Sequence, residues 1–503
     1  MVNKLIGLEM IIATNKENSR TIERELRSEF PDIENTIVED AAFTIMNAVM
    51  RHSINEKIVV LIGDGSIGAI GFAALRLMRL AEFDAIGLLC GCHDEPTIIG
   101  ECDDVRFLEY DWAKKMQLPL TIDCSIINVA GVIIDAISDE KSGNGNHDCV
   151  KRIIECSNDC SAYRIAVNIP SGMDEETGAI TGSVFNANET IALHCVKRGL
   201  LLTDNREAIG ELSVRRILPL TDDKLLSLTH EMLIDEHFVR SLLPNRKLVS
   251  NKGTYGRSLI VAGSNGMNGA AVMAASAALH TGSGLVNAYV PEGVVHAFGV
   301  RPEIMVNADE GMPDSLNSLM HKANAICVGC GSGEDAHIRQ KLMMIIESGK
   351  PCVIDADGLN NLTAEHVSKL HENCVLTPHP GEMARLIGVG IHDVLKDRVA
   401  AARDYALKNN CVLLLKSSVT VIASPSGVIR YNISGNPGLA KGGSGDVLAG
   451  IITALLAQGL KPFDAASVGA FLLGVSADKA LELLNNRMLT ACDVIDAISL
   501  FNC

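Results

Sequence analysis

The segment NPGLAKGGSGD, residues 436–446, comes directly before an apolar stretch, residues 447–456, that is typical of a helix. Glycine lets successive backbone N–H groups converge on an anion, and the positive end of the following helix adds to the attraction. The pattern therefore predicts a phosphate-binding loop with one acid, Asp446, beside the phosphate. The spacing is not the G-x-x-x-x-G-K-[ST] of a Walker loop, which argues against an ordinary P-loop NTPase. An acid placed there only to cap the helix is the alternative.

Four strand-like runs in the same half of the chain end in polar or glycine-rich turns. The runs are residues 258–262, 325–328, 353–354 and 374–376, and the turns after them contain GSNGMNGAA, GCGSG, DADGLN and TPHPGE. In parallel α/β sheets, ligands gather at the carboxyl ends of the strands. We therefore expect these turns to line one cleft.

The first half of the chain also alternates strand-like and helix-like stretches. Residues 58–62 lead into a G-x-G-x-x-G turn at Gly63, Gly65 and Gly68, which suggests a dinucleotide site. Asp94 is the best-placed acid for a ribose, but the pattern alone is weak evidence. Further strands are expected at residues 120–123, 132–135 and 166–169.

A chain of 503 residues is too long for one ordinary core, since a domain has about 150 residues. Residues 220–224 have the composition of a linker. We therefore expect two α/β domains, residues 1–220 and 221–503.

The composition excludes several classes of partner. The formal net charge of −17 argues against nucleic acid and anionic membranes, because both need a basic patch. No apolar run is long enough to cross a membrane, and residues 1–14 lack a cleavage-site pattern. The fifteen cysteines are scattered, which is typical of buried thiols rather than of a disulfide framework. We expect a cytoplasmic protein, a homo-oligomer, that acts on small molecules.

The second half resembles the bifunctional NAD(P)H-hydrate repair enzymes, in which an epimerase domain precedes an ADP- or ATP-dependent dehydratase domain. The resemblance runs from about residue 232 to the end. It rests on LLP-x-R at 242–246, KGTYGR at 252–257, the 262–271 loop, TPHPGE at 377–382, KSSVT at 416–420 and the 436–446 segment. The resemblance implies an N-terminal Rossmann-like α/β/α domain followed by a ribokinase-like α/β domain.

The resemblance also implies the chemistry. Such enzymes phosphorylate the ring hydroxyl of an (S)-NADH- or (S)-NADPH-hydrate with ADP or ATP and then expel phosphate, with Mg²⁺ bridging the phosphates. Asp446 would be the general base, and the helix dipole is expected to favour its ionised form. The substrate would contact Ala270, Gly331, His379 and Asp446. The nucleotide and its phosphoryl group would contact Lys416, Ser417, Ser418, Val419, Thr420, Gly442, Gly443, Ser444 and Gly445.

Each of these residues also has a purely structural alternative. Ala270 would serve helix packing, His379 would cap a turn, and Lys416 would be a solvated residue at a strand end.

The resemblance of the first half, residues 35–215, is weaker where the chemistry belongs. The family's N-N-G-G-D-G phosphate loop is SIGAIG here, residues 66–71, and its V-D-I-P-S-G segment is VNIPSG, residues 167–172. Asn168 cannot act as a carboxylate base, because an amide gains no proton near neutral pH. Asp135 and Ser171 remain at positions where the family binds K⁺. We hypothesise that this domain keeps its fold but has lost most or all epimerase activity.

Two other functions remain open on the sequence alone. One is a ribokinase-superfamily kinase of a vitamin precursor or sugar, which would release a stable phosphorylated product. The other is a non-catalytic nucleotide sensor with the first domain as its regulatory half, although a sensor needs no base beside its phosphate.

Overall fold

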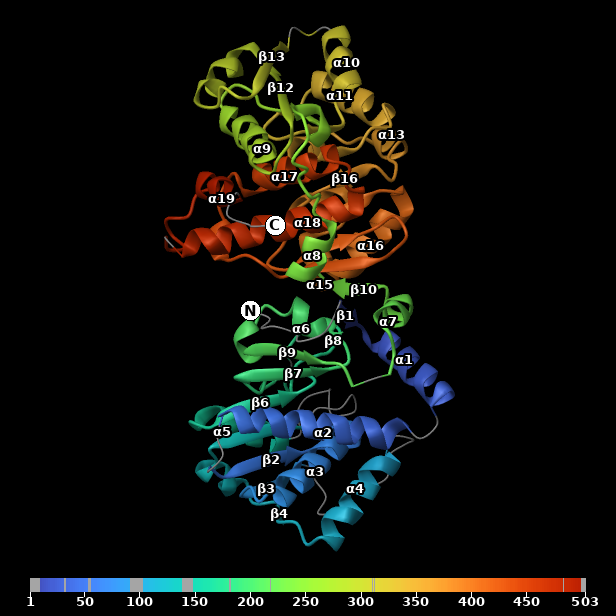
Figure 1. Ribbon diagram of the computed structural model, residues 1–503, viewed down its shortest axis with the longest axis vertical. Coiled ribbons are helices and arrows are strands. Elements are labelled where there is room, and N and C mark those ends of the chain that lie inside the picture. Colours follow the sequence, from blue (N-terminus) through green and yellow to red (C-terminus); the bar gives the residue numbers. More distant parts are fainter. Residues whose placement is uncertain are drawn as a thin grey trace. The chain divides into compact units, whose positions relative to one another are not determined.

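The structure is a computed structural model and describes residues 10–30, 33–52, 56–90, 103–137, 148–180, 182–217, 219–309, 311, 313–482 and 484–498. Asp94 lies outside these residues. The chain forms two compact units, Met1–Thr229 and His230–Cys503, coloured blue to green and green to red in Figure 1. Each unit is described by itself.

The division between the units lies nine residues later than the sequence indicates. The expected linker at 220–224 runs into helix α7 (Asp222–Thr229). Helix α7 is tied to the first unit, because Asp222 Oδ2 accepts a hydrogen bond from Met10 N at 3.0 Å and Thr229 O accepts one from Asn18 Nδ2 at 2.8 Å. The polar composition at 220–224 is therefore that of a helix start.

The first unit is a Rossmann-like α/β/α domain. Its seven-stranded sheet has the order β4-β3-β2-β5-β6-β7-β9, with every pair parallel. Two apolar clusters lie on the two faces of this sheet, one of them formed largely with α2 and α3 and the other with α5. The strands are β2 (Ile58–Ile62), β3 (Ala85–Leu89), β4 (Leu120–Thr121), β5 (Val132–Ala136), β6 (Tyr163–Val167), β7 (Glu189–Leu193) and β9 (Glu211–Arg215), and β1 (Ile11–Thr14) pairs with β8 (Val196–Lys197). The helices are α1 (Lys16–Glu29), α2 (Ile33–His52), α3 (Gly65–Leu80), α4 (Asp103–Lys115), α5 (Asp148–Asp159) and α6 (Arg198–Leu202), followed by α7.

The second unit is a mixed sheet covered by helices. Its strands have the order β13-β12-β11-β14-β15-β16-β17-β18-β19-β10, parallel from β13 to β17 and antiparallel at β17-β18 and β18-β19. The strands are β10 (Glu231–Leu233), β11 (Arg257–Val261), β12 (Leu285–Pro291), β13 (Met305–Asp309), β14 (Ala325–Val328), β15 (Cys352–Ile354), β16 (Cys374–Leu376), β17 (Val412–Leu415), β18 (Thr420–Ala423) and β19 (Ile429–Asn432). The helices are α8 (Glu236–Leu242), α9 (Asn268–His280), α10 (Pro313–Lys322), α11 (Ala336–Glu347), α12 (Asp357–Asn360), α13 (Ala364–Val367), α14 (Pro380–Ile387), α15 (Ile391–Lys396), α16 (Arg398–Asn409), α17 (Ser444–Ala457), α18 (Pro462–Leu481) and α19 (Ala491–Ile498).

Helix α17 is the helix that the 436–446 segment predicts, and it packs closely against α9 (Figure 1). The two backbones approach so closely that a Cβ at Gly450 would lie 2.1 Å from Ala274 O. Helices α9, α17, α18 and α19 share one apolar cluster with the central strands. This packing fixes the start of α17 above the carboxyl ends of the sheet.

Neither unit contains a helix, within the residues the structure describes, whose apolar stretch would span a bilayer. The described cysteines are free thiols and most of them are buried, as their scattered positions predict.

Candidate active site

The loop before α17 has the backbone that the glycine pattern predicts. Gly443 immediately precedes the helix with φ +99°, a conformation that favours glycine. A Cβ at Gly443 would also lie 2.6 Å from Met273 Sδ of α9. The first N–H groups of a helix have no partner within it, so this start can bind an anion. Asp446 lies in the first turn of α17, beside that position.

Turns from neighbouring strands meet Asp446 at one point. Within the described residues, the ligand atoms of Cys330, Asp355 and Asp446 lie within 4.8 Å of one another. Cys330 follows β14 and Asp355 follows β15. Lys416, at the end of β17, donates a hydrogen bond from Nζ to Asp355 Oδ1 at 2.7 Å, and Thr377, at the end of β16, donates one from Oγ1 to the same oxygen at 2.8 Å. Three of the four turns expected to lie together, those after β14, β15 and β16, thus bring side chains to one point.

Desolvation and nearby charges set the acidity of Asp446. Burial raises its pKa to about 6, and the charge of Asp355 adds to the rise, while a hydrogen bond from the Cys330 thiol and the charge of Lys416 lower it. The sequence led us to expect that the helix dipole would favour the ionised form at neutral pH. Desolvation opposes ionisation and was not part of that expectation. Asp446 is still mostly ionised at neutral pH, but it is a stronger base than an ordinary aspartate.

Lys416 is an ion-paired residue, and the alternative of a solvated strand-end lysine is wrong. Its side chain is 22% exposed and that of Asp355 is 2% exposed. Burial opposes the charge of Lys416, but Asp355 and Glu382 raise its pKa above the ordinary value, so it stays a cation. A Cβ at Gly445 would lie 3.4 Å from Lys416 Nζ, which places this cation against the loop.

The cluster of Cys330, Asp355 and Asp446 does not fit a resident Mg²⁺. Mg²⁺ prefers oxygen ligands in octahedral geometry, whereas Cys330 offers a thiol. Asp355 is already neutralised by Lys416. Any Mg²⁺ bound here would therefore need most of its oxygen ligands from other groups, such as phosphates.

The expected substrate residues occupy two places. Gly331, with φ +62°, lies so close to α9 that a Cβ there would be 2.9 Å from Ala270 Cβ, so Ala270 and Gly331 are neighbours. His379 caps α14, because its Nδ1 accepts hydrogen bonds from Gly381 N at 3.0 Å and Glu382 N at 3.3 Å. The capping alternative for His379 therefore holds, and its Nε2 lies 3.5 Å from Glu382 Oε1, although the side chain is 54% exposed.

The expected nucleotide residues 416–420 form the turn from β17 to β18. Lys416 N donates to Pro378 O at 2.8 Å, which ties this turn to the TPHPGE turn. The Ser417 hydroxyl bonds to Arg398 Nη1 at 2.9 Å, Val419 is fully buried, and Thr420 begins β18. The Lys416 side chain thus reaches Asp355, while Val419 anchors the turn in the core.

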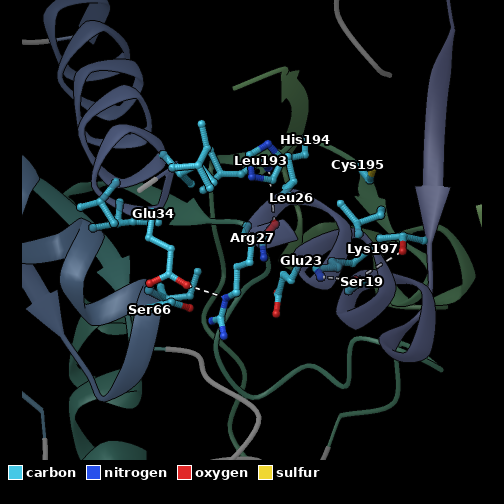
Figure 2. A pocket seen from close by; sticks show the side chains of 18 residues that line it. Ser19, Glu23, Leu26, Arg27, Glu34, Ser66, Leu193, His194, Cys195 and Lys197 are labelled. Carbon is cyan, nitrogen blue, oxygen red and sulfur yellow. Dashed lines mark hydrogen bonds and ion pairs between the residues drawn. The ribbon is translucent and has the colours of Figure 1, made fainter. Parts of the chain in front are cut away.

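The first unit has a cavity of about 180 Å³ between α1, α2, α3 and the ends of β6 and β7 (Figure 2). Its walls include Ser66, Ile67 and Ile70 of the altered loop and Asn168. Asn168 has φ +67°, and its Oδ1 accepts a hydrogen bond from Leu193 N at 3.4 Å, so the amide serves the backbone.

Glu23, Glu34 and His194 are titratable groups that line this cavity. Glu34 is paired with Arg27 at 2.6 Å, as Figure 2 shows. Burial lowers the pKa of His194 to about 3, and the charge of Lys197 contributes, so the imidazole is neutral. His194 Nδ1 has no hydrogen-bond partner among the described residues.

Asp135 and Ser171 lie together, but the Asp135 carboxylate already accepts hydrogen bonds from Ser171. Ser171 N and Oγ donate to the two Asp135 carboxylate oxygens at 2.8 and 2.6 Å, and Ile137 N donates at 3.2 Å. Burial raises the pKa of Asp135 to about 6 against these hydrogen bonds. This pair alone does not fit a potassium ion, because its acceptor capacity is largely taken by N–H and O–H donors.

Comparison with known proteins covers both units. A family model described as NAD(P)H-hydrate dehydratase matches residues 258–500, and one described as YjeF-related protein N-terminus matches residues 35–199. The bifunctional NAD(P)H-hydrate repair enzyme of Moorella thermoacetica is 33% identical, over 94% of this chain and 93% of that protein. The chain belongs to the bifunctional NAD(P)H-hydrate repair enzymes.

Other relatives agree with this membership. The repair enzyme of Escherichia coli K12 is 32% identical over 88% of this chain and 84% of its own length, and that of Coxiella burnetii is 38% identical over 72% and 74%. A ribokinase-like superfamily protein of Enterococcus faecalis is 26% identical, with a TM-score of 0.50 over 54% of this chain and 95% of its own. This NAD(P)H-hydrate repair enzyme thus has a ribokinase-like dehydratase unit, as its motifs predict.

The sequence analysis named the turns that contain Asp355, Cys330 and Thr377 but gave none of these three side chains a role. Asp355 follows a buried strand directly, which is the one pattern that could have singled it out. Its pairing with Lys416 joins residues 61 positions apart, so no local pattern reveals it.

Proposed function

We propose that the second unit dehydrates (S)-NAD(P)H-hydrate by phosphorylation and elimination, with Asp446 as general base. The observation that carries this assignment is the placement of Asp446 in the first turn of α17, near Asp355 and Lys416 and next to the glycine loop. In this scheme the backbone of Gly442, Gly443, Ser444 and Gly445 binds the transferring phosphoryl group. Ala270, Gly331 and His379 contact the hydrate, and residues 416–420 contact the adenine nucleotide.

The proposed dehydration has two chemical steps, phosphorylation and elimination. Asp446 accepts the proton of the ring hydroxyl while the hydroxyl oxygen attacks the terminal phosphorus of the nucleotide. The nucleotide leaves shortened by one phosphoryl group. The carbon–oxygen bond then breaks, phosphate departs with the bonding electron pair, and a neighbouring ring carbon loses a proton to restore the double bond. One nucleotide is therefore consumed, and one phosphate released, for each dinucleotide repaired.

The finer properties of this enzyme are proposals of the same kind. We infer that ADP or ATP is the donor, that Mg²⁺ arrives with its phosphates, and that NADH- and NADPH-hydrates are both substrates. We also propose a cytoplasmic homo-oligomer. The net charge of −17 supports only the further proposal that the protein binds neither nucleic acid nor anionic membranes. A potassium ion near Asp135 and Ser171 would need further oxygen ligands.

The acid limb of the pH profile follows from the state of Asp446. Only the ionised carboxylate accepts a proton, and its pKa is raised to about 6. We expect kcat/KM for the hydrate to be constant from neutral pH down to about 6 and then to fall about tenfold per pH unit. Initial rates at saturating nucleotide, in buffers from pH 4.5 to 8, measure this limb. A rate that stays constant down to pH 5 would contradict a base with this pKa.

We infer that the first unit no longer catalyses epimerisation. Asn168 replaces the family's acid and bonds to Leu193 N, and isoleucines line the cavity where the phosphate loop should be polar. Full-length Asp446→Asn protein, which cannot consume either epimer, is incubated with purified (R)-NADH-hydrate. Conversion to the S form should be no faster than in buffer, as followed by chromatography. Conversion that accelerates in proportion to protein concentration would show that the cavity still catalyses the reaction.

A further inference from the structure

Asp355 is a buried acid close to the phosphate-binding loop, and both its backbone and its side chain are held by hydrogen bonds. It is 1% exposed and directly follows β15. Its backbone N donates to Val328 O at 3.2 Å, and a Cβ at Gly329 would lie only 2.0 Å from its carbonyl oxygen. A carboxylate this deeply buried costs stability unless it is paired. The Asp355 carboxylate therefore depends on its hydrogen bonds from Lys416 and Thr377.

Those partners fix a cation at the loop. Oδ1 of Asp355 accepts hydrogen bonds from Lys416 Nζ at 2.7 Å and Thr377 Oγ1 at 2.8 Å. The backbone of Lys416 is held by Pro378 O at 2.8 Å. A lysine side chain is flexible, and its ordering costs free energy when it must be fixed during the reaction. Here the ammonium is already fixed, next to the position that a Cβ at Gly445 would occupy.

The same carboxylate acts on Asp446. The ligand atoms of Asp355 and Asp446 lie within 4.8 Å, and like charges at such a distance oppose each other's ionisation. Asp355 is among the causes that raise the pKa of Asp446, and Lys416 is among those that lower it. Asp355 therefore strengthens the base, while Lys416 keeps that base ionised at neutral pH.

We propose that Asp355 is a positioning residue of the dehydratase, which fixes the Lys416 ammonium at the phosphate-binding loop and tunes Asp446 through the resulting carboxylate–ammonium–carboxylate arrangement. This inference rests on the proposed function, because it takes Asp446 as the base. Asp355 itself does not need to touch the substrate.

The test compares pH profiles of single variants. Asp355→Asn keeps the size of the side chain but removes its charge, so the acid limb of kcat/KM should move to lower pH by about one unit. The KM for the nucleotide should rise about tenfold, because Lys416 loses its fixed position, equivalent to about 1.4 kcal/mol. Lys416→Met removes the cation and should move the limb in the opposite direction, to higher pH. If Asp355 had a merely structural role, its replacement would lower the rate but leave the pH of the acid limb of kcat/KM unchanged.

Asp357→Asn is the matched control. Asp357 lies two residues away and also carries a negative charge, but its Oδ2 accepts from Gly333 N at 2.8 Å and has no bond to Lys416. Among the groups that shift the pKa of Asp446, Asp357 has the smallest effect. Its pH profile and nucleotide KM should stay close to those of the unchanged protein.

The outcomes separate the inference from the proposed function. If Asp446→Asn keeps its activity, the assignment of the base fails. If Asp446→Asn is inactive but Asp355→Asn and Lys416→Met both keep the original limb, the positioning role of Asp355 is overturned. Thermal unfolding checks that each variant is folded. Should Asp355→Asn not fold, the upward shift in Lys416→Met and an unchanged Asp357→Asn profile carry the test.

Discussion

Replacing Asp446 with asparagine is expected to lower kcat for dehydration by about 10² to 10⁴-fold. The amide keeps the size of the side chain, but it has no affinity for the hydroxyl proton near neutral pH. The KM for the nucleotide should change little, because the loop backbone and Lys416 are untouched. Initial rates of dinucleotide recovery at saturating hydrate and nucleotide measure the effect.

Asp357→Asn controls for the loss of one nearby carboxylate, since Asp357 accepts a hydrogen bond from Gly333 N and is not part of the Cys330–Asp355–Asp446 cluster. That variant should keep most of its kcat. If both variants lost activity equally, the effect would come from the overall charge of the cleft, and the specific role of Asp446 would be contradicted.

Gly443→Ala is expected to lower kcat/KM for the nucleotide by about 10- to 100-fold. Its φ of +99° is strained for alanine, which costs about 1–3 kcal/mol. The new Cβ would also lie 2.6 Å from Met273 Sδ and 2.9 Å from Ala491 Cβ. The loop must therefore shift, and its N–H groups would no longer converge on the phosphoryl group.

Gly442→Ala is the matched control for this loop. It keeps its N–H group, and a Cβ at that position meets nothing within 4 Å. Nucleotide titrations of initial rate on both variants, with thermal unfolding midpoints, separate binding from folding. Equal losses in the two variants would mean that the backbone geometry of Gly443 has no special part in binding phosphate.

The phosphate-binding half of this protein could be predicted from sequence because its constraints are local. The glycines of 436–446, the apolar helix after them and the short buried strands each depend on neighbours along the chain, and the structure places α17, β11, β14, β15 and β16 accordingly. The sequence motifs also predicted the family to which the chain belongs. Asp446 could be singled out because it is an acidic residue at the end of a glycine-rich run.

Other features depended on contacts that no local pattern contains. The pairing of Asp355 with Lys416 needs β15, β16 and β17 to be adjacent, which only the sheet order determines. The pKa of Asp446 depends chiefly on burial by surrounding elements and on the charge of Asp355, which is distant in the sequence. Residues 220–224 were wrong as a linker, because contacts with the first unit draw them into helix α7.

The most direct test of the phosphorylation–elimination account is a stoichiometry. The protein is incubated with (S)-NADH-hydrate, Mg²⁺ and ATP or ADP, while the dihydronicotinamide absorbance in the near ultraviolet and the released phosphate are followed together. The account predicts one phosphate for each NADH restored, no recovery when nucleotide is omitted, and recovery about 10² to 10⁴-fold slower with Asp446→Asn. A stable phosphorylated hydrate that accumulates in place of NADH, or recovery that proceeds without nucleotide, would contradict it.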